Sequence, residues 1–193
     1  MPEPTLARRP SAQQPAVIRR LGPADLLAYK NLRDEALRLY PEAFTSDHES
    51  QRLRTPESYL GRLGLNEPLG GSFLLGAFVK EDGGRERLVG SVGLERDTRN
   101  KTRHISRLIG LMVLPTHNGH GIGSALVGAC VTAAHQAADL QMIVLSVTAS
   151  SDRVLRLYER AGFRRYGLLP RAVRLVDARG EHYFDRAHMQ LTL

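Results

Sequence analysis

The run from residue 108 to residue 126 constrains the fold most strongly, because it joins an apolar strand to a helix through a short glycine-rich loop. The strand, 108–114, is followed by Pro115, and glycines then stand at positions 119, 121 and 123. Glycine lets the backbone approach a ligand closely, and the first N–H groups of the helix have no internal partner. The segment 118–123, named the glycine loop below, therefore predicts a cradle for a phosphate or pyrophosphate.

Two common phosphate-binding motifs do not fit the glycine loop. A nucleotide-hydrolase loop requires a lysine after its last glycine, but Ser124 follows Gly123. A dinucleotide fingerprint requires the spacing G-x-G-x-x-G. The place of its third glycine is occupied by Ser124 if the motif starts at Gly119, and by Leu126 if it starts at Gly121. The loop instead closely resembles the Q/R-x-x-G-x-G/A loop of the GCN5-related N-acetyltransferases (GNAT), which holds the pyrophosphate of acetyl-coenzyme A (acetyl-CoA). Here it reads Asn118-Gly119-His120-Gly121-Ile122-Gly123, with asparagine where the family usually has arginine or glutamine.

A second segment strengthens this resemblance. The β-branched, apolar stretch 142–148 indicates a buried strand, and Ser150 or Ser151 can cap the helix that follows. The usual form of the family at this place is N-x-x-A-x-x-L-Y-x-x-x-G-F. The chain has Ser151 and Val154 at its first two positions and keeps the pairs Leu157-Tyr158 and Gly162-Phe163.

The expected fold is one α/β (α+β) domain of the GNAT type, with a mixed, mostly antiparallel central sheet flanked by helices. A chain of 193 residues is long enough for one domain with a full core. Residues 1–15 hold four prolines and no periodicity, which predicts a disordered N-terminal arm. The acetyltransferase domain is then expected to cover residues 16–193.

The apolar pattern predicts the element order β-α-α-β-β-β-α-β-α-β-β, which is the order of the GNAT fold. Strands are expected at 16–21, 73–79, 88–95, 104–114, 142–148, 172–176 and 182–193. Helices are expected at 23–39, 55–64 and 121–138 and after Ser151. The segment 44–54 is expected to be a polar loop, and the turn at 82–84 to close a hairpin.

Composition excludes several classes of protein. The chain lacks a run of about 18 apolar residues, so no membrane association is expected, and its first residues lack the apolar core of a secretory signal. A single cysteine, Cys130, excludes an internal disulfide, and its place on an apolar helix face predicts a buried structural thiol. A cytoplasmic location is expected.

The positive charge of the chain does not by itself indicate a nucleic-acid partner. The formal net charge is +7, but the basic residues are spread along the chain without a basic stripe and interleaved aromatic residues. The same charge suits the polyanionic coenzyme A or an acidic substrate. Neither His117 nor His120 has a second histidine or an acid at ligand spacing, so no metal is expected.

The resemblance implies acyl transfer from a thioester to an amine. It makes the backbone N–H of Val113 the donor to the thioester oxygen and Tyr158 the acid that protonates the leaving thiolate; Tyr158 also fits a packing role on its apolar helix face. The alternative to an enzyme is a coenzyme A-binding sensor or regulatory module without turnover. The resemblance also implies acetyl-CoA contacts from Leu111, Met112, Val113, Asn118, Gly119, His120, Gly121, Ile122, Gly123, Ser124, Ser151 and Tyr158.

The general base is left open by the sequence. Many family members carry a glutamate on the strand before the glycine loop, and the stretch 105–114 has no acid. Glu95, at the end of the preceding strand, is the first candidate, followed by His104, because histidine side chains can act as bases near neutral pH, and by Glu35. A chain of water molecules needs no named base.

The acceptor is expected to be a primary amine of a small molecule or a protein, attacked without an enzyme-bound intermediate. The family places acceptor specificity in the first two helices, their connection and the late hairpin, here 40–54 and 171–183. Beyond Phe44 the first of these segments has two acids, Asp47 and Glu49, beside Arg52 and Arg54, which disfavours a polycationic acceptor such as an aminoglycoside. The acyl group, acetyl or longer, stays open, as does a homodimer.

Overall fold

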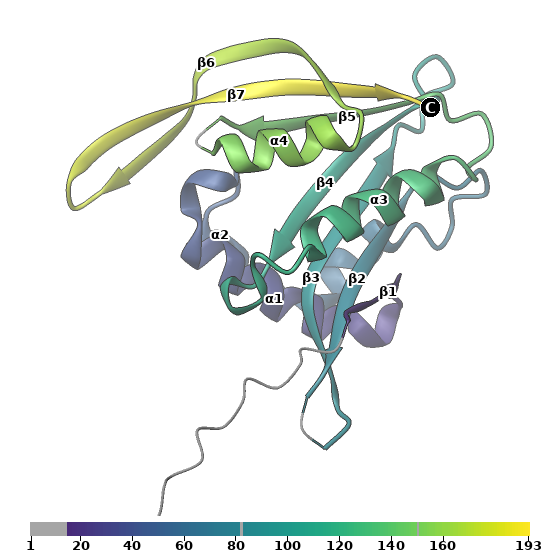
Figure 1. Ribbon diagram of the computed structural model, residues 1–193, viewed down its shortest axis with the longest axis horizontal. Coiled ribbons are helices and arrows are strands. Elements are labelled where there is room, and N and C mark those ends of the chain that lie inside the picture. The colour runs from purple at the N-terminus through teal and green to yellow at the C-terminus, as the bar shows by residue number, and fades with distance from the viewer. Residues whose placement is uncertain (1–14, 82, 150) are drawn as a thin grey trace, which may run out of the picture.

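The computed structural model describes residues 15–81, 83–149 and 151–193, and a seven-stranded sheet runs through it in the order β1-β2-β3-β4-β5-β7-β6 (Figure 1). Neighbouring strands are antiparallel except β4 and β5, which are parallel. The expected mixed, mostly antiparallel sheet is thus confirmed. The strands are β1 (Val17–Arg20), β2 (Phe73–Lys80), β3 (Glu86–Arg96), β4 (Ile105–Val113), β5 (Met142–Thr148), β6 (Arg164–Asp177) and β7 (Gly180–Thr192).

Helices cover both faces of the sheet. Figure 1 shows α3 in front of β3 and β4, α1 behind the strands, and α2 next to α1 at the side of the sheet. The α-helices are α1 (Leu26–Leu39), α2 (His48–Arg52), α3 (Ile122–Ala134) and α4 (Asp152–Arg160). Short 3-10 helices lie at η1 (Pro23–Asp25), η2 (Pro41–Ala43), η3 (Pro56–Leu63) and η4 (Pro115–His117).

The core lies between the helices and strands β2 to β5. On α1 the expected apolar face is buried at Tyr29, Leu32 and Ala36, whose spacing places them one above another on a helix. On α3, Leu126 and Cys130 are fully buried in the same way. The helical periodicity thus correctly identified the packed faces. Within the described residues, none of the helices has the length and apolar character needed to span a lipid bilayer.

The sheet opens between β4 and β5, and this opening positions the site. The two strands pair only through 105–107 and 142–144, and then diverge. A β-bulge interrupts the other edge of β4, because Ser91 pairs with Met112 whereas Gly93 already pairs with Ile109. Gly110, inside the bulge, has φ +58°, a conformation that favours glycine. Bulges bend a strand and redirect its groups, so β4 leaves β5 with part of its edge unpaired.

Several predicted boundaries were wrong. The polar loop at 44–54 contains α2, which begins after Asp47, whose carboxylate accepts from the Ser50 N–H at 2.7 Å. The first helix begins with a separate 3-10 turn, the second is entirely 3-10, and α3 stops at Ala134. The strand expected at 172–176 is much longer, because β6 lies at the sheet edge, where Pro170 is tolerated. Residues 1–14 of the predicted arm and Asp82 of the hairpin turn lie outside the described residues.

Candidate active site

A cleft of about 1070 Å³ runs along the opening between β4 and β5. Its walls come from β4, the glycine loop and the start of α3, and, across the opening, from β5 and α4. The connection from α1 to α2 and single residues of β6 and β7 complete the walls. The η2 turn contacts both β5 and β6, so the α1–α2 connection closes over this end of the sheet.

The glycine loop adopts the open conformation that a phosphate cradle requires. Gly119 has φ +85° and Gly121 has φ +78°, and Gly121 is the residue immediately before α3. No atom lies within 4 Å of the position that a Cβ would take at either glycine, so the space beside the loop is free. The first N–H groups of α3 lack helical acceptors and point toward this space. The loop and the helix start can therefore bind an anionic group.

The other loop residues are placed differently. The Asn118 side-chain amide donates to the Tyr40 hydroxyl at 3.3 Å, which ties the glycine loop to the end of α1. His117 lines the cleft, and its pKa is lowered by burial and by nearby Arg87, which favours the neutral imidazole. His120 is exposed and is not among the residues that form the cleft walls.

The end of β4 presents free backbone groups to the cleft. The Leu114 N–H donates to the Val89 carbonyl on β3 at 2.8 Å. Because successive N–H groups of an extended strand point to opposite edges, the Val113 N–H points to the open side, where β5 has diverged. Leu111 and Met112 line the same stretch of the cleft. This edge can accept an extended, amide-containing ligand as an additional strand would pair.

Tyr158 projects from α4 into the cleft wall. It is buried, and its ring meets Phe163 edge to face at a centroid distance of 5.7 Å. Burial, with nearby Cys130 contributing less, raises the pKa of the Tyr158 phenol, so the hydroxyl stays protonated near neutral pH. Among the described residues the hydroxyl has no hydrogen-bond partner, which leaves the proton free for a ligand. Both the packing role and a role as a proton donor fit this position.

Cys130 has the structural role expected from the sequence. It lies on α3 with no exposed surface, and burial raises the pKa of its thiol to about 12. A thiol with such a pKa is a poor nucleophile at neutral pH. Ser151 caps α4 at its start without a side-chain hydrogen bond and lines the cleft.

The candidate bases lie apart from one another. Glu95 pairs across the sheet with Arg107 and lies 3.8 Å from the Arg62 Nε, behind the residues that form the cleft wall. His104 precedes the paired end of β4, roughly 30 Å of extended strand from Val113. Glu35 is on α1 and is not among the lining residues. Among these three, Glu95 is therefore the carboxylate or imidazole best placed for the cleft.

Sequence reasoning missed two groups of cleft residues. Glu42, in the η2 turn, is the single carboxylate in the walls among the described residues. The second group consists of arginines, and no motif marks them because they come from five different elements. They are Arg33, Arg62, Arg107, Arg153, Arg160 and Arg186.

Three solved structures share this fold. An acetyltransferase of the GNAT family from Streptococcus pneumoniae shares 21% identity and a TM-score of 0.75, covering 92% of this chain and 99% of that one. The Salmonella typhimurium protein yncA, solved with its cofactor acetyl-CoA, shares 22% identity at a TM-score of 0.73, covering 93% and 95%. A phosphinothricin acetyltransferase from Sinorhizobium meliloti in complex with acetyl-CoA shares 19% at 0.71, covering 93% and 89%.

The sequence also matches a family model directly. The match covers residues 30–163, which include most of α1, the opening of the sheet, the glycine loop, α4 and the residues after it to Phe163. The strand that leads into the loop, the loop itself and the helix that carries Tyr158 thus all lie inside the matched part. Since this part is well over half of its length, the chain belongs to the acetyltransferase (GNAT) family.

Proposed function

We propose that this protein transfers the acetyl group of acetyl-CoA to a primary amine by direct attack. The proposal rests on one observation: a single cleft contains an open anion cradle, a strand edge with free backbone groups and the buried hydroxyl of Tyr158. Membership of the acetyltransferase (GNAT) family supports it. So do the two neighbours solved with acetyl-CoA.

In this proposal the cofactor lies along the glycine loop and the free edge of β4. The pyrophosphate takes the N–H groups at Gly121, Ile122 and Gly123, because the helix start offers unpaired donors and a positive dipole end. The amide groups of the pantetheine arm pair with the β4 edge beside Leu111 and Met112. Two arginines of α4 flank Leu157, whose Cδ1 lies 3.2 Å from the Cβ position of Gly123. These two, Arg153 and Arg160, are placed to neutralise phosphate charge.

The chemistry requires one bond to form and one to break. The neutral amine nitrogen attacks the thioester carbon, and the carbonyl oxygen becomes negative in the tetrahedral state. The Val113 N–H stabilises that oxygen, as an oxyanion donor does. The carbon–sulfur bond then breaks, and Tyr158 gives its proton to the departing thiolate. Phenol and thiol have ordinary pKa values of about 10 and 8.5, close enough for this transfer.

The attacking amine must also lose a proton, because an alkylammonium has a pKa of roughly 10. Glu95 is the proposed acceptor, acting through a chain of water molecules, because its carboxylate lies near Arg62 and is not part of the cleft wall. Glu42 is the alternative acceptor, because it lines the cleft directly. The nitrogen loses a second proton as the tetrahedral state collapses to the amide. One of the two protons returns through solvent to Tyr158, and the other is released to solvent.

Turnover tests this proposal. The protein is incubated with acetyl-CoA and a panel of amines that are cationic, neutral or anionic apart from the amino group, and thiol release is followed. Acetyl-CoA-dependent release with at least one amine, with the acetylated amine identified by mass spectrometry, is the expected result. Tight binding of acetyl-CoA without release for any amine contradicts the proposal and identifies a coenzyme A-binding sensor.

A further inference from the structure

Five of the six arginines of the cleft fall into two groups with different neighbours. Arg153 and Arg160 lie on α4 beside the glycine loop, as described above. Three others lie on the far side of the opening, on α1, η3 and β4. This second group, the acceptor-side arginines, consists of Arg33, Arg62 and Arg107.

Arg33 is a buried cation without a carboxylate partner among the described residues. Its side chain reaches only neutral acceptors, the Ser46 hydroxyl at 3.1 Å and the Gln51 amide oxygen at 3.5 Å. The residue is 4% exposed, yet it lines the cleft. A charge removed from water is costly unless an opposite charge meets it. An anion bound on the cleft side would therefore stabilise the buried charge of Arg33.

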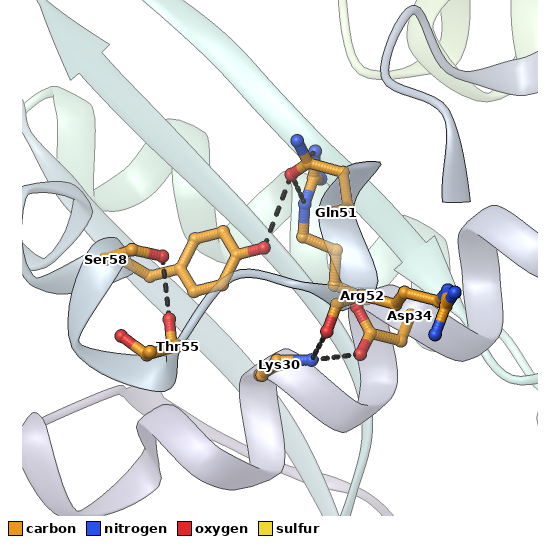
Figure 2. A network of polar contacts seen from close by, with 8 residues as sticks. Lys30, Asp34, Gln51, Arg52, Thr55 and Ser58 are labelled. Carbon is orange, nitrogen blue, oxygen red and sulfur yellow. Dashed lines mark hydrogen bonds and ion pairs between the residues drawn. The ribbon is translucent and has the colours of Figure 1, made fainter. Parts of the chain in front are cut away.

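The carboxylate next to Arg33 in the sequence is already engaged. Figure 2 shows Lys30 between Asp34 and the backbone of Arg52, at the junction of α1 and α2. Lys30 Nζ forms an ion pair with Asp34 and donates to the Arg52 carbonyl oxygen at 3.2 Å. This network attaches α2 to α1. Because Asp34 is paired with Lys30, its negative charge is not available to balance the positive charge of Arg33.

Arg62 and Arg107 extend the positive surface to the bulge of β4. Arg62 Nη1 donates to the Tyr29 hydroxyl at 3.0 Å, and that oxygen lies 3.7 Å from the Cβ position of Gly110. Arg107 stands directly opposite Glu95 in the sheet, on the same face. The Glu95 Oε1 lies 3.8 Å from the Arg62 Nε, which is a long ion pair. A single, weakly paired carboxylate therefore faces the charges of Arg62 and Arg107.

The opposite wall also carries an unsatisfied donor. Arg186 of β7 lines the cleft and donates from Nη2 to the Ser146 carbonyl oxygen at 2.9 Å. Its buried Nε has no hydrogen-bond partner among the described residues. A buried donor without a partner costs free energy that a ligand can recover.

We propose that the acceptor is a small amine with a second, anionic group, a carboxylate or a phosphate, which binds the acceptor-side arginines while the amine faces the thioester. This inference rests on the proposed function and specifies its substrate class. Guanidinium groups bind both anions through paired N–H donors. Within the described residues, the cleft walls contain six arginines and one carboxylate, Glu42, a balance that disfavours polycationic acceptors.

The test uses pairs of acceptors that differ only in the anionic group. Each of several amino acids is compared with its α-carboxamide, and O-phosphoethanolamine with ethanolamine, at saturating acetyl-CoA. For at least one type of pair, we expect kcat/KM of the anionic acceptor to exceed that of its neutral counterpart by about 10-fold or more. A hydrogen bond to a charged group contributes roughly the free energy that corresponds to such a ratio. The pair type that shows the preference distinguishes carboxylate from phosphate.

Substitutions of the acceptor-side arginines test which residues cause the preference for anionic acceptors. Arg62→Met and Arg107→Met should each raise KM for the anionic acceptor about 10-fold more than KM for the neutral member of the pair, so that the preference is lost. Arg62→Lys should restore part of the loss, since it keeps the charge but not the paired donors. Arg99→Met is the matched control, because Arg99 pairs with Asp97 in the connection from β3 to β4, outside the cleft. A merely structural role of Arg62 would affect both members equally.

The outcomes separate this inference from the proposed function. Turnover with equal kcat/KM for both members of every pair, or best turnover with cationic acceptors, overturns the inference and leaves the acetyltransferase intact. If no amine supports thiol release, calorimetric titration of the same pairs into the CoA-saturated protein decides. Binding of the anionic member that is lost in Arg62→Met supports the site, and absence of binding overturns it.

Discussion

The two halves of the cleft are built in different ways. The half that we propose for acetyl-CoA, the cofactor half, presents main-chain groups of contiguous segments, from the end of β4 through the glycine loop into α3. The half that we propose for the acceptor, the acceptor half, presents side chains from separate elements, such as Arg33 of α1, Arg62 of η3 and Arg186 of β7. The first half presents N–H groups and free space, and the second presents guanidinium groups. Backbone recognition suits a cofactor shared by a whole family, whereas side chains can change with the acceptor.

The largest expected effect is on the cofactor half. Gly121→Val should weaken acetyl-CoA binding by about 10³-fold, because it removes the approach to at least two charge-assisted hydrogen bonds. The wild-type residue has φ +78°, which a β-branched residue adopts only under strain. Calorimetric titration with acetyl-CoA measures the effect. Unchanged affinity in a folded variant would show that the cofactor does not bind at the glycine loop.

Gly128→Ala is the matched control for this variant. Gly128 lies in the middle of α3, and no atom lies within 4 Å of its Cβ position. The alanine should leave cofactor affinity unchanged and should stabilise the protein by about 0.5–1 kcal/mol, the usual difference between glycine and alanine inside a helix. Thermal unfolding of both variants separates a loss of binding from a loss of fold.

The next effect concerns the chemistry between the two halves. Tyr158→Phe keeps the ring against Phe163 and removes only the hydroxyl. Turnover should fall about 10²-fold while acetyl-CoA affinity barely changes, as expected for a lost general acid. Equal turnover of the two proteins would leave Tyr158 with a packing role alone.

The wild-type pH profile provides a second test of Tyr158. An acid loses its function as the pH rises through its pKa, and burial raises the pKa of Tyr158 above the ordinary phenol value. The kcat/KM profile should therefore show no alkaline limb below pH about 10. A decrease centred between pH 7 and 9 would contradict the assignment.

The smallest effect is expected for the base. Glu95→Gln should lower kcat/KM about 10-fold and change the acidic limb of the pH profile, because that limb reports the essential base of the free enzyme. The isosteric variant Glu42→Gln distinguishes the alternative. If only Glu42→Gln changes the acidic limb, the base belongs to the α1–α2 connection, and if neither does, deprotonation proceeds through solvent.

The comparison of the halves also explains what the sequence could predict. The order of elements, the glycine loop and the helix with Tyr158 could be predicted, because each is encoded by residues close together in the chain. The burial of Tyr29, Leu32 and Cys130 followed from helical spacing in the same way. Of the predicted cofactor contacts, His120 is the one that the structure does not bring to the cleft walls.

The acceptor half could not be predicted for a physical reason. Its members are brought together only by the packing of α1, η3, β4 and β7, so no local spacing marks them. Arg33 looks like a surface residue in the sequence, yet it is 4% exposed beneath α2. The extent of β6 was missed because the bulge between Leu169 and Val173 interrupts its alternation. Glu42 stands in a short turn with no pattern around it.

Single-turnover mass spectrometry tests directly whether the acetyl group passes within one cleft from the cofactor to the amine. The protein is loaded with acetyl-CoA, the excess is removed, and an active acceptor is added. We expect one acetylated amine for each coenzyme A released, with no change in the mass of the protein itself. An acetylated form of the protein before the acceptor is added, or release of coenzyme A without an acetylated amine, would contradict it.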